Sequence, residues 1–307
     1  MHICSIGECM IELSNVKDNL FKQSFAGDTA NTAIYLSRLG AKSSYFSSVG
    51  KDDLSIKMLN FLKQENVLTN NIFHNKNKTL GLYLIENNKK GERNFFYWRS
   101  NSAAKTLFEN VNSKKLFDQI SKNNAIYFSG ITLSIYNQKS INDFYKILKL
   151  LKNNGTKICF DFNVRMKNWK SKKIAQQTMI KFSNIADIVF MTKEDINNLG
   201  LKNHKTIINN NYKNKITVFR LGNGEINVFN KGNFEKYKVY LIKKVKDTTG
   251  CGDAFNACFL YNYFNSSNTS DCIKLAHGLG KIVANFKGAI IPKKILILNS
   301  MSNEIIK

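Results

Sequence analysis

The chain contains 307 residues, which is enough for one large domain or two modest ones with a sizeable core. Apolar residues make up an ordinary 43%, and no apolar run reaches the roughly 18 residues that a transmembrane helix needs. The formal net charge is +24, but the lysines are scattered and form no zinc-finger, RNA-recognition or helix-turn-helix pattern, so we expect no nucleic-acid partner and no membrane partner.

The N-terminal stretch MHICSIGECMIEL lacks a basic start, and Glu8 interrupts its apolar residues. We therefore interpret it as a buried first strand and not as a secretion signal. Downstream, short β-rich runs alternate with helical stretches, without a repeat or a domain-length linker. This alternation predicts an α/β fold with a mostly parallel sheet and helices on both faces. The expected strands are 2–7, 43–50, 125–130, 157–162, 188–192 and 216–222, and the expected helices are 29–40, 54–67, 140–155 and 254–264.

The segment GLYLIENNKKGERNFFYWR, residues 81–99, departs from this alternation. Two β-rich runs flank a polar turn, which predicts a hairpin that stands apart from the parallel sheet. Because side chains alternate along a strand, Phe95, Tyr97 and Arg99 share one face, and the two intervening aromatic residues share the other. Both faces are aromatic, so we expect both to be covered. Arg99 is then either a surface cation stacked on a ring or a buried receptor for an anion.

The cysteines and histidines show no metal-binding or disulfide pattern. No pair of cysteines has CxxC spacing, and most of the cysteines lie among apolar residues. They predict reduced thiols in a cytoplasmic protein and no structural transition-metal site. The cysteines are Cys4, Cys9, Cys159, Cys251, Cys258 and Cys272, and the histidines are His2, His74, His204 and His277.

The stretch DTTGCGDAF, residues 247–255, precedes a segment that is apolar on nearly every side. A buried helix that starts here leaves several amide groups without partners. Gly250 and Gly252 have no Cβ atom, so a ligand can approach the backbone closely, and the helix dipole adds partial positive charge. Together these features predict a phosphate site, with a simple capped turn as the alternative.

Asp253 distinguishes the two interpretations. A capping residue normally precedes the first turn, and Thr248 or Thr249 could fill that position. A carboxylate inside a phosphate site repels its ligand unless it has a chemical task. The natural task is to accept the proton of a hydroxyl group that attacks phosphorus. No GxxxxGK[ST] loop and no protein-kinase motif is present.

At this point the residues resemble a known family. DTTGCGDAF resembles the DTxGAGD signature of the ribokinase-like (PfkB) carbohydrate kinases, and FAGDTANTAIYLSRLG resembles their glycine-rich sugar-binding motif. The likeness runs from IGECMIELS to KGAIIP, nearly the whole chain. It implies a ribokinase-like three-layer αβα core in a single domain, residues 1–307, with a small β-sheet lid drawn from roughly 9–25 and 80–102. An exposed lid edge would allow two copies to form a dimer through the lid.

Within the family, GLYLIE, GERNFFYWR and DFNVR most resemble the 2-keto-3-deoxygluconate kinases. Members phosphorylate the 6-hydroxyl of that sugar acid, giving 2-keto-3-deoxy-6-phosphogluconate and ADP. The resemblance therefore implies ATP and Mg2+, together with a loop that flanks the adenine or a monovalent cation. An arginine suits the carboxylate of a sugar acid because of its planar fork, which supports the same substrate class independently.

The matching motifs also imply roles for individual residues. Asp253 matches the catalytic base, and Gly250, Cys251 and Gly252 form the anion hole. The substrate residues are Gly27, Asp28, Asn31, Tyr83, Tyr97, Arg99 and Arg165. The nucleotide residues are Asn163, Arg165, Arg220, Gly222, Gly224, Gly250, Gly252, Lys287 and Gly288.

Three positions depart from the family pattern. The family's N-x-x-E motif corresponds to TKED here, where Asp195 or Glu194 is left to reach magnesium through water. Ala26 replaces the first glycine of a common pair. Cys251 stands where alanine is usual, and its thiol is either a slightly larger alanine or a group whose oxidation or alkylation blocks phosphate binding.

Two other functions remain as alternatives. A fructokinase or other neutral-sugar kinase would use the same turn without needing Arg99. A nucleic-acid-binding protein on an inactive kinase scaffold would explain the charge of +24, but the intact glycines and Asp253 argue against it.

Overall fold

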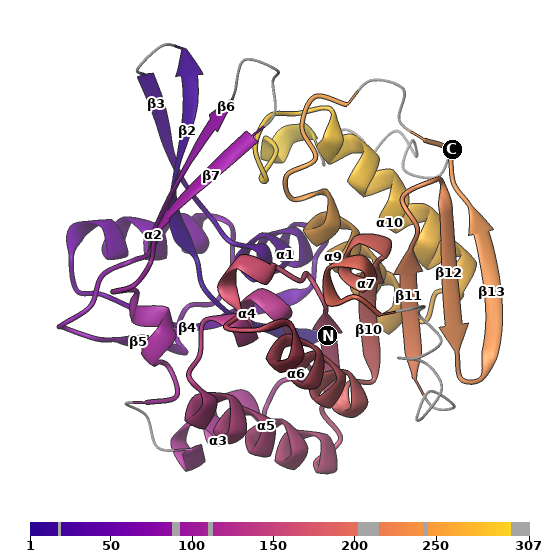
Figure 1. Cartoon of the computed structure of the whole chain (residues 1–307), viewed down its shortest axis with the longest axis horizontal. Coiled ribbons are helices and arrows are strands. Elements are labelled where there is room, and N and C mark those ends of the chain that lie inside the picture. The colour runs from indigo at the N-terminus through magenta and orange to yellow at the C-terminus, as the bar shows by residue number, and fades with distance from the viewer. Residues whose placement is uncertain (18–19, 88–92, 110–112, 202–214, 242–244, 296–307) are drawn as a thin grey trace.

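The six expected strand runs form the parallel centre of one large sheet (Figure 1). The computed structural model describes residues 1–17, 20–87, 93–109, 113–201, 215–241 and 245–295. The strand order is β13-β12-β11-β10-β9-β8-β1-β4-β5, and every pair from β11 to β5 is parallel. These strands are β1 (His2–Ile6), β4 (Lys42–Val49), β5 (Ile72–His74), β8 (Ala125–Ser129), β9 (Lys157–Asp161), β10 (Ile188–Thr192), β11 (Ile216–Arg220), β12 (Glu225–Asn230) and β13 (Asn233–Lys238).

Helices cover both faces of this sheet, as the alternation of the sequence predicts (Figure 1). One face packs against α3 (Ser113–Ile120), α4 (Gly130–Ser134), α5 (Gln138–Asn153), α6 (Lys172–Ile185) and α7 (Lys193–Leu199). The other face packs against α1 (Asp28–Arg38), α2 (Asp53–Gln64), α9 (Cys251–Phe264) and α10 (Thr269–Ala284). Two short 3-10 turns, η1 (Ala103–Thr106) and η2 (Met166–Asn168), complete the described helical elements.

Strand β8 shows why the layers hold together. Its side chains alternate, so Ile126 and Phe128 enter one core while Ala125 and Tyr127 enter the other. Helix α9 lies in the second core, where Phe259 is fully buried. Burying such a side chain contributes about 2 kcal/mol, which fixes the start of α9 relative to the sheet.

A second, smaller sheet stands apart from the large one (Figure 1). It contains β2 (Met10–Lys17), β3 (Leu20–Ala26), β6 (Leu82–Asn87) and β7 (Arg93–Trp98), in the order β3-β2-β6-β7. The predicted hairpin is confirmed as the antiparallel pair β6 and β7, and β6 also pairs in parallel with β2.

The expectation that both faces of this hairpin are covered is wrong for the single chain. Phe95, Phe96, Tyr97 and Trp98 remain 40%, 45%, 48% and 60% exposed. No other element of the described chain packs over them, because the smaller sheet projects from the layered core (Figure 1).

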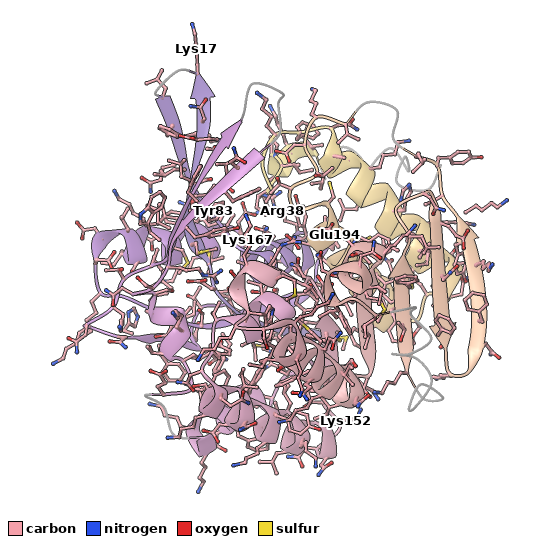
Figure 2. All side chains as sticks on the ribbon, viewed as in Figure 1. Lys17, Arg38, Tyr83, Lys152, Lys167 and Glu194 are labelled. Carbon is pink, nitrogen blue, oxygen red and sulfur yellow. The ribbon has the colours of Figure 1, made fainter. Side chains whose placement is uncertain are left out.

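Some elements were not predicted. The antiparallel edge strands β12 and β13 and the helices α6 and α10 fall outside the expected runs. Across the described ranges, no helix combines the length and apolar character needed to cross a membrane. Three labelled lysines lie apart in this view: Lys17 at the tip of the smaller sheet, Lys167 near the centre and Lys152 at the opposite end (Figure 2).

Candidate active site

Two helix N-termini and the carboxyl ends of the parallel strands meet at one edge of the large sheet. Asn31 of α1 donates from Nδ2 to Oδ2 of Asp253 in α9, at 2.8 Å. Asn163, which follows β9, donates from Nδ2 to Oδ2 of Asp28 at 2.9 Å. Ligands of open α/β sheets bind outside this edge. The structure therefore brings together four residues that the sequence placed in the site.

The turn before α9 fits only glycine at position 250. Gly250 has a φ of 74°, and a Cβ there would lie 2.6 Å from the carbonyl oxygen of Ala289. Gly250 is itself the cap residue, and no side chain caps the helix. The sequence had allowed Thr248 or Thr249 as the capping residue. Neither caps α9, because the helix begins at Cys251 and Gly250 takes the cap position.

The first turn of α9 presents free amide groups. The amides of Gly250, Gly252 and Asp253 donate to no atom in the ranges that the structure describes. The amide of Cys251 differs, because it donates to the Thr248 carbonyl oxygen at 3.3 Å. With the helix dipole, the three free amides make this end of α9 suitable for an anion.

The carboxylate of Asp253 lies at the same helix start and is only 8% exposed. Asn31 occupies Oδ2, whereas Oδ1 accepts no hydrogen bond from the described residues. Burial raises the pKa of Asp253 well above its usual value, and the nearby charge of Asp28 raises it further. The hydrogen bond from Asn31 partly offsets both effects. The free oxygen can therefore accept a proton from a hydroxyl group.

Asp161 is a buried carboxyl group that sequence reasoning missed. It ends β9 at the same edge and is 4% exposed. Burial raises its pKa to about 7, although the charge of Arg220 counteracts this, and the charges of Asp195 and Asp28 add to the rise. Two features of the sequence could have indicated Asp161 as a site residue: it ends an expected strand, and it is the first residue of the motif DFNVR.

Asp195 has a structural position in the capping box of α7. Its Oδ2 accepts hydrogen bonds from Thr192 N at 2.8 Å and Thr192 Oγ1 at 2.6 Å. Its Oδ1 accepts from Val164 N at 2.7 Å. Both oxygens are therefore engaged within the protein, while Glu194 is exposed. That Asp195 or Glu194 reaches magnesium through water therefore stays a prediction.

Asp247 clamps the glycine turn to a later segment. It accepts from Thr249 N at 2.6 Å through Oδ1 and from Gly288 N at 2.8 Å through Oδ2. Gly288 therefore lies beside the turn, as its assignment to the nucleotide region requires, and the neighbouring Lys287 is exposed. The sequence did not predict that Asp247 joins these two segments.

Arg220 ends β11 and lies against the first turn of α9. Its Cζ atom is 5.0 Å from the centre of the Phe255 ring. The following turn carries Gly222 and Gly224 and closes through Leu221 N, which donates to the Glu225 carbonyl oxygen at 3.0 Å. Arg220 and the two glycines of the following turn, all assigned to the nucleotide, thus lie at the same edge as Asp253.

The smaller sheet places its predicted aromatic face together. The ring centre of Tyr97 lies 5.9 Å from that of Tyr83 and 6.4 Å from that of Phe95, so these rings share one face. Tyr83 lies where the smaller sheet meets the core (Figure 2). Burial raises the pKa of Tyr83 well above its usual value, so its hydroxyl stays protonated.

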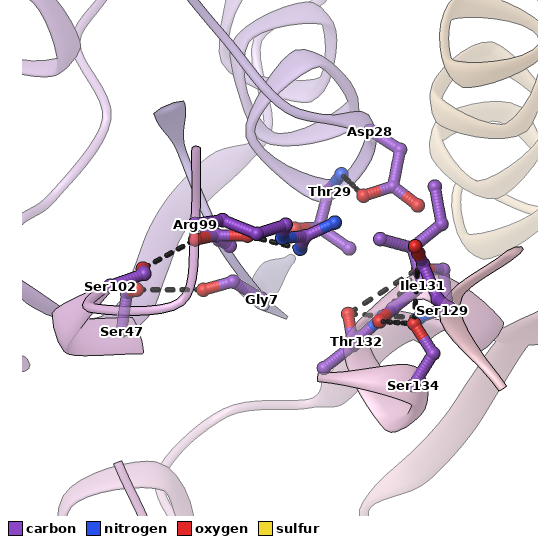
Figure 3. Close-up of polar contacts among 12 residues, drawn as sticks. Gly7, Asp28, Thr29, Ser47, Arg99, Ser102, Ser129, Ile131, Thr132 and Ser134 are labelled. Atoms are coloured by element: carbon purple, nitrogen blue, oxygen red, sulfur yellow. Dashed lines mark hydrogen bonds and ion pairs between the residues drawn. The ribbon is translucent and has the colours of Figure 1, made fainter. Parts of the chain in front are cut away.

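Two buried carboxylates that sequence reasoning missed hold this face. Glu8 accepts hydrogen bonds from Arg99 Nη2 and from Ser102 Oγ, while Glu12 accepts one from the hydroxyl of Tyr83. The Arg99 guanidinium extends from the side of Ser102 towards α1 (Figure 3). Arg99 is therefore half-buried, with its side chain 14% exposed, and each alternative holds in part. Its Cζ atom lies 5.9 Å from the centre of the Tyr97 ring, and Glu8 of the chain itself is the anion it holds. Its Nε atom is buried and has no partner.

Gly27 and Arg165 complete the predicted set. A Cβ on Gly27 would lie 2.1 Å from the carbonyl oxygen of Glu8, so only glycine fits where α1 begins. Arg165 is exposed after β9, and its charge lowers the pKa of both Asp253 and Asp161. Arg165 is therefore an exposed cation at the rim of a site that contains several buried acids.

The acids of this edge do not form a protein cage for magnesium. Among the described residues, no group of three or more His, Cys, Asp or Glu side chains could hold a metal ion. Mg2+ commonly keeps several waters and binds through substrate phosphates with one or two carboxylates. The donor set fits an ion that arrives with a nucleotide and does not fit a resident metal.

Comparisons with known proteins agree with this geometry. The profile described as pfkB family carbohydrate kinase matches residues 1–296. The chain is 34% identical to a 2-dehydro-3-deoxygluconokinase of Dickeya dadantii, over 95% of this chain and 97% of that one. A solved 2-dehydro-3-deoxygluconokinase from Thermotoga maritima has a TM-score of 0.81 at 20% identity, covering 98% of this chain and 99% of that one. A Xylella fastidiosa fructokinase with bound ATP has a TM-score of 0.83 at 17% identity, covering 99% of both chains.

Proposed function

The chain belongs to the pfkB family of carbohydrate kinases, and we propose that it transfers a phosphoryl group from ATP to the 6-hydroxyl of 2-keto-3-deoxygluconate. This compound is the 2-dehydro-3-deoxygluconate in the name of the Dickeya dadantii relative. The products are 2-keto-3-deoxy-6-phosphogluconate and ADP. The observation that carries the proposal is the buried Asp253 carboxylate beside the free amides of Gly250 and Gly252.

In this mechanism the protein orients the hydroxyl and the phosphoryl group. The free Oδ1 of Asp253 accepts the proton as the hydroxyl oxygen bonds to the γ-phosphorus, and the bond to the bridging oxygen breaks, so that ADP leaves. Asn31 fixes the carboxylate through Oδ2. The amides of Gly250 and Gly252 hold the phosphoryl oxygens, and Cys251 contributes through the shape of the turn. When bound with the nucleotide, Mg2+ would neutralise phosphate charge.

The smaller sheet supplies the argument for an acid substrate. A guanidinium has five N–H donors, and Glu8 accepts one hydrogen bond from Nη2 of Arg99. Other donors, among them the unpartnered Nε, are left for the substrate carboxylate. Because Glu8 offsets the charge of Arg99, the exposed Arg165 supplies the remaining positive charge. Tyr83 and Tyr97 cover the sugar from the same face.

The remaining assignments follow from this reaction. We place ATP along Arg220, Gly222 and Gly224, with the segment around Lys287 and Gly288 beside it, where a monovalent cation would also bind. Residues 1–307 then form one kinase domain, and the smaller sheet acts as its lid and excludes water. The exposed aromatic residues of the lid favour a dimer of two copies, and we expect a cytoplasmic protein.

A phosphorylation screen tests the substrate. The purified protein is offered ATP and Mg2+ with 2-keto-3-deoxygluconate, its galactonate epimer and fructose, and ADP release and the product mass are measured. We expect the two sugar acids to react with a higher kcat/KM than fructose. Replacing Arg99 with Ala should raise the KM for the acids about tenfold or more, because a charge-assisted hydrogen bond is lost. A wild-type preference for fructose would contradict the acid assignment and favour the fructokinase alternative.

A further inference from the structure

Arg220 lies directly beside the anion-binding start of α9. A Cβ placed on Gly252 would lie 3.3 Å from Nη1 of Arg220 and 3.6 Å from Nη2. Phe255 lies one turn into the helix, and the Cζ atom of Arg220 stacks over its ring at 5.0 Å from the ring centre. The cation therefore neighbours one of the three free amides.

This guanidinium makes no direct ion pair in the described part of the chain, although its charge acts on the carboxyl group of Asp161. Its Nε is buried and has no hydrogen-bond partner, and no ion pair joins it to a residue in the part of the chain that the structure describes. Arg38 and Arg99 differ, because Arg38 pairs with Glu65 at 2.7 Å and Arg99 pairs with Glu8. Buried donors are normally satisfied, so the geometry at Arg220 indicates an anion that arrives with a ligand.

The position along the turn identifies which anion this is. Gly252 directly precedes Asp253, whose free oxygen faces the attacking hydroxyl in the proposed function. An anion that contacts both the Gly252 amide and Arg220 is therefore next to the reacting oxygen. The edge also carries the carboxylates of Asp28 and Asp161, which repel a phosphoryl group unless a cation compensates.

We propose that Arg220 binds the transferring γ-phosphoryl group itself and stabilises its charge during transfer. This inference rests on the proposed function and deepens it. The hydroxyl oxygen forms its bond to phosphorus, the bond to the bridging oxygen breaks with its electron pair going to ADP, and Asp253 takes the proton. Arg220 keeps its proton throughout and holds the equatorial oxygens, where the transition-state charge is spread.

Nucleotide binding without the sugar tests this role. ATP and ADP affinities are measured by calorimetry for the wild type, Arg220→Met, Arg220→Gln and Arg220→Lys. Lys146→Met is the matched control, since it removes one charge from a side chain that is 75% exposed on α5. Steady-state kcat and KM are measured for the same proteins.

We expect both neutral variants to weaken ATP about ten- to hundredfold more than ADP, and to lower kcat about 10²- to 10³-fold. Arg220→Lys should keep part of both properties, and the control should change neither. Equal weakening of ATP and ADP would overturn the proposal, because Arg220 would then hold the inner phosphates. Unchanged affinities would also overturn it and leave only packing on Phe255. If the wild type binds ATP but phosphorylates no sugar acid, the proposed substrate fails while the binding comparison still decides the role of Arg220.

Discussion

Replacing Asp253 with Asn changes one atom of the proposed base and keeps the shape of the site. The asparagine carbonyl oxygen can still accept the 2.8 Å hydrogen bond from Asn31. The amide nitrogen then replaces the free Oδ1, and it donates a hydrogen bond where a proton must be accepted. Loss of a general base lowers the rate about 10²- to 10⁴-fold, which corresponds to about 3–5 kcal/mol of activation free energy.

The assay is a coupled measurement of ADP release at saturating sugar acid, with ATP binding measured separately by calorimetry. We expect kcat to fall by these two to four decades while the ATP affinity stays within a few-fold, since the backbone amides are untouched. Asp271→Asn is the matched control, because Asp271 undergoes the same change on the exposed start of α10. A kcat of Asp253→Asn within tenfold of the wild type would refute the assignment of the base.

The pH profile adds a second test of the same residue. The proposed base must be ionised, and burial and the charge of Asp28 raise its pKa. The acid limb of kcat/KM should therefore begin at a higher pH than for an ordinary aspartate, whose pKa is about 3.9. Asp28→Asn removes the repulsion and should move this limb to lower pH. A limb that does not move would show that another group controls it.

Three further predictions concern stability, thiol chemistry and assembly. Folding raises the pKa of Asp161 from 3.8 to about 7, so its contribution to stability is full below pH 3.8 and is lost as the pH rises to about 7. That pKa difference corresponds to about 4 kcal/mol of unfolding free energy. Asp161→Asn should therefore flatten the pH dependence of the free energy of unfolding in urea between pH 4 and 7. An unchanged pH dependence would contradict the assignment. Cys251 is half-buried and the other five cysteines are buried, so iodoacetamide should label Cys251 first and block kinase activity. Bound ATP should slow this labelling. Full activity after confirmed labelling of Cys251 would reject the prediction. Replacing Phe96 and Trp98, which are 45% and 60% exposed, with Lys should give a monomer by light scattering if the lid forms the dimer, and an unchanged dimer would exclude this face.

The core strands were predictable because their signal is local. Strand β8 and its neighbours are short apolar runs that are buried on both faces, which a parallel sheet requires. The glycine turn was predictable for a similar reason, since Gly250 and Gly252 directly precede an apolar helix. Edge strands such as β13 alternate exposed and half-buried residues and therefore lack such a run.

The carboxylates that hold the lid could not be predicted. Glu8 meets Arg99 across 91 positions of the chain, and Glu12 meets Tyr83 across 71. Neither carboxylate lies near its partner in the sequence. Glu12 meets Tyr83 because β2 pairs with β6 in the smaller sheet. The same holds for Asn31 and Asp253, whose hydrogen bond spans 222 positions and exists because α1 packs on α9.

The most direct measurement is an experimental structure with a non-hydrolysable ATP analogue and 2-keto-3-deoxygluconate bound together. We predict that the 6-hydroxyl lies within about 3.2 Å of the Asp253 carboxylate, as proton transfer requires. The γ-phosphoryl oxygens should accept hydrogen bonds from the amides of Gly250 and Gly252. A nucleotide whose terminal phosphate lies away from this turn, or a sugar whose hydroxyl faces another group, would contradict the mechanism.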